Sequence, residues 1–190
     1  ELIDFLIDNI GNVTSVRSIT EALSTNRTPV DHKTVGKYVD ALCRAFAFYR
    51  IRRYDIRGKR YLRSEDKYYL ADQSFRFARL GTKDMDWGRV LENIIAIELL
   101  RRGYEVYVGV LYKKEIDFVA MRHGEKVYIQ VANDISEERT FEREVTPLLA
   151  IRDAYPKIVI ARTYQPAFQH EGVLIIDAAE WLAKGIPQNQ

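Results

Sequence analysis

Residues 104–132, YEVYVGVLYKKEIDFVAMRHGEKVYIQVA, decide the fold of this chain. Apolar side chains alternate with polar or small ones at 106–110, 116–120 and 127–131, and this period of two predicts three consecutive strands. His123-Gly124 lies between the second and third strands, where glycine suits the positive φ of a two-residue hairpin loop. These two strands are therefore expected to form a hairpin.

The hairpin loop also predicts the register of the two strands. With the residues that flank the loop paired, Asp117 lies opposite Gln130, and Glu115 lies opposite Ala132. Opposed side chains share a face, with Cβ atoms about 4.5–5.5 Å apart. An acid on one strand is thus expected to face a Gln-Val-Ala segment on the next.

The preceding segment, residues 85–102, predicts a long helix that ends at the following glycine. Glu98 lies one turn before Arg102, and we expect an ion pair between them. Glu92 has glycine or apolar residues one and two turns away, so its burial is costly without a partner. It either joins Asp117 in holding a divalent cation, or it accepts a hydrogen bond from a backbone amide or an arginine.

An inward helix glutamate, then EIDFV at 115–119 and YIQVA at 128–132, resembles the PD-(D/E)XK nuclease fold. The family pattern has a metal-binding Asp on one strand, then Glu or Gln, any residue and Lys on the next. Asp117 matches the first position and Gln130 the second. Ala132 stands at the third, so the lysine of the pattern is missing.

This resemblance implies a catalytically degenerate site. Its remnant is Glu92, Asp117 and Gln130, of which Glu92 and Asp117 would bind Mg²⁺ weakly. A lysine at position 132 would position the attacking water and stabilise the developing charge. We expect no other lysine to replace it, because two lysines precede the second strand and Lys126 points to the opposite face. An active metal-dependent nuclease that uses the same three residues is the alternative.

Residues 54–182 also resemble the C-terminal domain that follows an AAA-type P-loop ATPase domain and a winged helix in many bacterial and archaeal proteins. The residues that carry this resemblance are KYYLAD at 67–72, GRVLENIIAIELLRRGYEVYVG at 88–109, FEREVTPLLAIRDAYPKIVI at 141–160 and GVLIID at 172–177. The ATPase domain, with its ATP and Mg²⁺, is expected outside these residues. The chain has no phosphate loop of its own, and it begins at Glu1 rather than Met, so we expect it to be part of a longer protein.

The first 80 residues predict a winged helix. Three short amphipathic helices, the third capped by Asp31, are followed by strand-like segments around an Arg57-Gly58 turn. In the third helix, residues 35, 39, 42 and 46 form the expected buried stripe. Overall the chain is expected to be α/β (α+β), with a winged helix at 1–80 and a PD-(D/E)XK-like mixed sheet flanked by helices at 81–190.

Positive charge is concentrated in the first domain. Residues 1–80 hold 15 Lys and Arg against 10 acids, although the net charge of the whole chain is only +2. Such clustering suits contacts to nucleic-acid phosphates. The expected contact residues lie on the third helix and on the wing: Lys33, Lys37, Arg44, Arg52, Arg53, Arg57, Lys59 and Arg60. Alternatively, Asp40 neutralises Lys37 and Arg44, and the winged helix docks on the ATPase domain.

The composition favours a cytoplasmic protein without a membrane segment. No apolar run approaches spanning length, and the single Cys43 allows no internal disulfide. We expect a nucleic-acid-binding or regulatory module of an AAA-type ATPase that needs no cofactor in these residues. Its expected partners are double-stranded DNA and its own ATPase domain. A nuclease and a protein-interaction module are the two alternatives.

Overall fold

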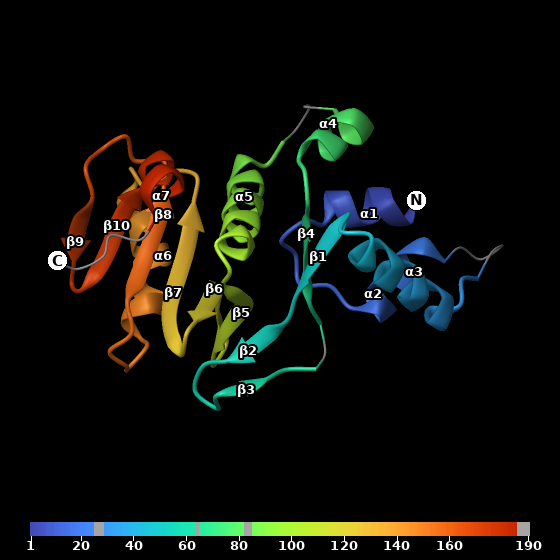
Figure 1. Ribbon diagram of the computed structural model, residues 1–190, viewed down its shortest axis with the longest axis horizontal. Helices are drawn as coiled ribbons and strands as arrows, with labels where there is room; N and C mark the ends of the chain where they lie inside the picture. Colours follow the sequence, from blue (N-terminus) through green and yellow to red (C-terminus); the bar gives the residue numbers. More distant parts are fainter. Residues whose placement is uncertain (25–28, 64, 82–84, 186–190) are drawn as a thin grey trace.

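The computed structural model describes residues 1–24, 29–63, 65–81 and 85–185. Over these residues the chain has a mixed α+β fold with seven helices and a mixed eight-stranded sheet (Figure 1). The expected boundary around residues 82–84 lies outside the described residues.

The first three helices are short, and side chains cap two of them. They are α1 (Leu2–Asp8), α2 (Val16–Leu23) and α3 (His32–Arg44). Ser15 caps α2, and Asp31 caps α3 as predicted. Each side chain accepts a hydrogen bond from a backbone N–H that has no partner within its helix. Phe46 was expected in the buried stripe of α3, and this was wrong. The helix ends at Arg44, and Phe46, with φ of 56°, is 69% exposed.

Two strands follow the helices and pair with each other. They are β1 (Phe48–Ile51) and β4 (Lys67–Leu70), which form an antiparallel two-stranded sheet. Every residue of β4 is buried. The chain between β1 and β4 contains β2 (Arg53–Asp55) and β3 (Arg60–Tyr61), the expected wing.

The wing does not project freely into solvent. β2 pairs in parallel with β5, with Asp55 opposite Val110, so that β2 and β3 form one edge of the large sheet. In this sheet the order is β3-β2-β5-β6-β7-β8-β10-β9. Residues on both sides of the expected boundary at position 80 therefore share one sheet.

The remaining strands build the rest of this sheet. They are β5 (Glu105–Leu111), β6 (Lys114–Arg122), β7 (Glu125–Ala132), β8 (Lys157–Ala161), β9 (Phe168–His170) and β10 (Val173–Asp177). The β5–β6 and β6–β7 pairs are antiparallel, whereas β8 is parallel to both β7 and β10. The sheet is therefore mixed.

Helices pack on both faces of the large sheet. The helices beyond β4 are α4 (Ser74–Leu80), α5 (Trp87–Arg101), α6 (Glu138–Leu149) and α7 (Ala178–Lys184). Ile95 of α5 and Trp181 of α7 belong to one hydrophobic core, which also contains residues of α1 to α3. Leu148 of α6 packs in a second core on the opposite face. The N-terminal helices and the sheet thus share a core.

A polar contact joins β4 to α5. The side chain of Asn93 on α5 accepts a hydrogen bond from the Leu70 N–H (2.7 Å) and donates one to the Leu70 carbonyl (2.9 Å). Asn93 is 1% exposed, so both of its buried polar groups need these partners. This contact fixes β4 next to α5, which positions the candidate site.

Candidate functional site

The β6–β7 hairpin has the predicted register. Arg122 pairs with Glu125, and the pairing continues to Phe118 and Ile129. The φ values of His123 (53°) and Gly124 (83°) are both positive, as a two-residue hairpin loop of type I′ requires. The predicted hairpin is therefore confirmed.

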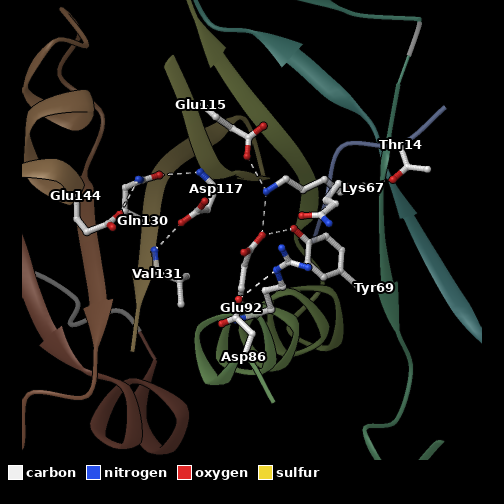
Figure 2. Close-up of polar contacts among 12 residues, drawn as sticks. Thr14, Lys67, Tyr69, Asp86, Glu92, Glu115, Asp117, Gln130, Val131 and Glu144 are labelled. Carbon is white, nitrogen blue, oxygen red and sulfur yellow. Dashed lines mark hydrogen bonds and ion pairs between the residues drawn. The ribbon is translucent and has the colours of Figure 1, made fainter. Parts of the chain in front are cut away.

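At Asp117 and Gln130, hydrogen bonds from backbone N–H groups to side chains join the two strands. The Asp117 N–H donates to Gln130 Oε1 (2.7 Å), and the Val131 N–H donates to Asp117 Oδ2 (2.8 Å; Figure 2). The structure thus brings Asp117 and Gln130 together, as the register predicts. Glu115, which was expected opposite Ala132, directs its carboxylate to a different partner.

That partner is Lys67 of β4. Its Nζ lies 2.7 Å from a carboxylate oxygen of Glu115 and 3.0 Å from Oε1 of Glu92 (Figure 2). Only 4% of the Lys67 side chain is exposed. Tyr69, two residues along the same strand, donates its hydroxyl to Glu92 Oε1 at 2.6 Å. We call Lys67, Tyr69, Glu92, Glu115 and Asp117 the lysine cluster.

The cluster contains a lysine that the sequence analysis did not consider. Lys67 comes from the N-terminal half of the chain and reaches the carboxylates through the packing of β4 beside α5. The cluster also shows which groups bind Glu92. They are the Lys67 ammonium and the Tyr69 hydroxyl, rather than a backbone amide or an arginine. In the sequence this lysine only begins the strand-like run KYYL, and the structure shows that every residue of this strand is buried.

The charges of the cluster depend on one another. Burial alone would lower the pKa of Lys67, but the nearby carboxylates of Glu92, Asp117 and Glu115 outweigh it and hold this pKa above its usual value. Burial and the negative charge of Glu92 together hold the pKa of Asp117 well above the usual range, although Lys67 and the Val131 N–H oppose them. The carboxylates thus favour the charged form of Lys67, and burial with Glu92 disfavours the ionised form of Asp117.

A second set of contacts extends from Gln130 to α6. Gln130 Nε2 donates to Glu144 Oε2 (3.0 Å), and Arg143 donates to Glu144 Oε1 (2.8 Å). Glu144 is only 6% exposed, so both of its oxygens are satisfied inside the protein. Asp117, Gln130 and Glu144 line an open cleft of about 560 Å³.

This arrangement does not fit a bound divalent cation. The ammonium of Lys67 already pairs with Glu92 and with Glu115, and Gln130 Oε1 already accepts the Asp117 N–H. Within the described ranges, no group of three or more His, Cys, Asp or Glu side chains is arranged to hold a metal ion. Glu92 is therefore paired with Lys67, whereas Asp117 accepts the Val131 N–H and donates its own N–H to Gln130.

The residues expected to contact nucleic acid lie in two separate places. Lys33, Lys37 and Arg44 are exposed on α3, whereas the β2–β3 residues lie beyond the far end of β1, against β5 (Figure 1). The alternative interpretation had Asp40 neutralise Lys37 and Arg44, but Asp40 pairs with Arg50. Arg52, Arg57, Lys59 and Arg60 are exposed; Arg53 pairs with Glu65, and Arg60 pairs with Asp55.

The proteins that match this chain cover most of its length, and none of them has a named activity. Residues 1–86 match the model of a domain of unknown function, DUF8612. An uncharacterized protein of Haemophilus influenzae is 42% identical over 178 residues, which cover 94% of this chain and 44% of that protein. Another, of Methanocaldococcus jannaschii, is 26% identical over 146 residues, which cover 75% of this chain and 32% of that protein.

The chain thus spans less than half the length of these two curated relatives. No solved structure gives a significant match. Across the part of the chain that the structure describes, no helix is long and apolar enough to cross a membrane.

Proposed function

We propose that this chain is the non-ATPase, C-terminal portion of an AAA-type ATPase, and that it binds nucleic acid or regulates the ATPase. In this proposal α1 to α3 with β1 and β4 are the winged helix, and the large sheet is a catalytically degenerate PD-(D/E)XK-like domain. The curated relatives are more than twice as long as the aligned region, which leaves room for an ATPase domain. ATP and Mg²⁺ would bind to that domain.

The position of Lys67 carries the proposal of degeneracy. A nuclease of this type needs a metal ion to stabilise charge on the phosphate and to activate water. Here Glu92, one of the two carboxylates that would hold such an ion, is paired with an ammonium 3.0 Å away, and this ammonium also lies 2.7 Å from Glu115. The ammonium cannot accept a water molecule as a ligand and acidify it as a metal ion does. The cluster therefore stabilises the contact between β4 and the sheet without supplying hydrolysis.

The exposed face of α3 supports the nucleic-acid half of the proposal. Lys33, Lys37 and Arg44 lie on one helix at intervals that place them along one side. Because Arg50 engages Asp40, the nearest acid on that helix does not neutralise them. A helix with such a side can enter a major groove or follow phosphates.

A charge-reversal experiment tests this proposal. The α3 variant is Lys33→Glu with Lys37→Glu and Arg44→Glu. The control variant reverses Arg101, Arg152 and Lys184, so it changes the net charge by the same amount. Arg101 and Arg152 precede the first residues of β5 and β8, and Lys184 ends α7. Fluorescence anisotropy with labelled duplex DNA should give a salt slope that is lower by about 2 to 3 for the α3 variant. The control variant should bind with the slope of the wild type.

If the α3 variant binds duplex as tightly as the wild type does, α3 is not the nucleic-acid surface. The protein-interaction alternative would then gain, and α4 supports it. This helix has no buried residue, and Phe75, Phe77 and Leu80 are between 37% and 52% exposed. A short helix of this kind depends on packing for its stability, so a protein partner would cover it.

A further inference from the structure

A second cationic surface lies at one end of the large sheet. Because β2 and β5 run in parallel, the turn after β2 and the turn after β5 emerge at the same edge. The first turn brings Arg57, Lys59 and Arg60, and the second brings Tyr112, Lys113 and Lys114. We call these six residues the turn patch.

The turn patch has a large excess of positive charge. Its five cations are all exposed, and the acid between them is Asp55, which pairs with Arg60 at 3.4 Å. Among the residues that the structure describes, no ion pair engages Arg57, Lys59, Lys113 or Lys114. Sequence separation hides this surface, since β2 and the β5–β6 turn are more than 50 residues apart.

The backbone of the first turn is held in place. The Gly58 N–H donates to Asp55 Oδ1 at 2.9 Å. A Cβ at position 58 would collide with the Asp55 carboxylate, so any other residue there would have to displace this side chain. The turn therefore presents Arg57 and Lys59 from a fixed loop rather than from a loose one, which lowers the entropy cost of binding a ligand.

An exposed aromatic ring lies among these cations. Tyr112 is 69% exposed, and the Arg57 guanidinium lies 5.3 Å from the centre of its ring. A guanidinium stacked on a tyrosine whose other surface faces solvent offers both a phosphate contact and a platform for a base. A base can stack on such a ring only where it is unpaired, because paired bases are stacked within the duplex.

We propose that the turn patch binds a single-stranded segment of nucleic acid, with its cations on the phosphates and Tyr112 under an unpaired base. This inference rests on the proposed nucleic-acid function and adds a second site to it. In Figure 1, α3 lies toward one end of β1, and β2 and β3 lie toward the other. One chain then holds duplex on α3 and an unpaired strand on the turn patch.

The test uses the full chain and one labelled oligonucleotide, as a single strand and annealed to its complement. The turn-patch variant is Arg57→Glu with Lys59→Glu and Lys113→Glu, and the control is the Arg101, Arg152 and Lys184 reversal described above. We expect the turn-patch variant to lower the salt slope for the single strand by about 2. Tyr112→Ala should weaken single-strand binding roughly tenfold and leave duplex binding unchanged, whereas Tyr112→Phe should retain both.

The outcomes separate this inference from the proposed function. If only the α3 variant loses binding and the turn-patch variant matches the wild type for both probes, the proposed function stands and the turn patch is not a site. If Tyr112→Ala affects neither probe, the single-strand assignment is wrong. If the wild type shows no salt-dependent binding to either probe, the proposed function and this inference both fall.

Discussion

Replacing Lys67 by methionine should destabilise the protein strongly. Methionine keeps most of the length of the side chain but removes the ammonium from between Glu92 and Glu115, whose side chains are 14% and 36% exposed. Removing one partner of a buried ion pair costs roughly 3–5 kcal/mol, because the remaining charges stay without compensation. For a domain of this size such a loss corresponds to a melting temperature lower by about 6–20 °C.

Thermal melting followed by circular dichroism measures this effect. Lys184→Met is the control, because Lys184 also pairs with a glutamate but is 75% exposed, and such surface pairs contribute at most about 1 kcal/mol. Adding Glu92→Gln and Glu115→Gln to Lys67→Met should recover part of the loss, since two uncompensated charges are removed. A melting temperature for Lys67→Met no lower than that of the control would refute the role given to Lys67.

Two further predictions concern the same region. Asn93→Ala should lower the free energy of unfolding by about 1–3 kcal/mol, because it leaves the Leu70 N–H and carbonyl without partners. Urea titration measures this change. An unchanged free energy of unfolding would show that this contact does not join β4 to α5. The second prediction concerns pH. Because the pKa of Asp117 is raised in the folded protein, its protonated form stabilises the fold fully below the usual aspartate pKa, and this stabilisation is lost as pH rises through the raised pKa. Asp117→Asn should therefore gain stability relative to the wild type as pH rises, and parallel curves for the two proteins would contradict the raised pKa.

Much of the local structure could be predicted from the sequence. The hairpin at His123-Gly124, the cap at Asp31 and the end of α5 before Gly103 (φ of 78°) follow from turn chemistry and periodicity, which act over a few residues. The ion pair of Glu98 with Arg102 likewise joins residues one helical turn apart. The contact of Asp117 with Gln130 follows from the hairpin register alone, so this part of the candidate site was within reach of the sequence.

The rest depends on contacts between distant segments. Nothing local to β2 shows that it pairs with β5, because the two strands are far apart in the chain and both have the pattern of ordinary strands. Lys67 reaches Glu92 only because Asn93 and the shared core place β4 beside α5. Asp40 is about one helical turn from both Lys37 and Arg44, and only the position of β1 brings Arg50 to it. Tertiary packing, not propensity, determines each of these partners.

The claim that an ammonium has taken the place of a metal ion is tested most directly by incubating the wild-type protein with supercoiled plasmid in Mg²⁺ or Mn²⁺. The account predicts that the plasmid stays supercoiled, both for the wild type and for Asp117→Ala. Metal-dependent nicking by the wild type that is lost in Asp117→Ala would contradict it, and would make the metal-dependent nuclease the better description of this chain.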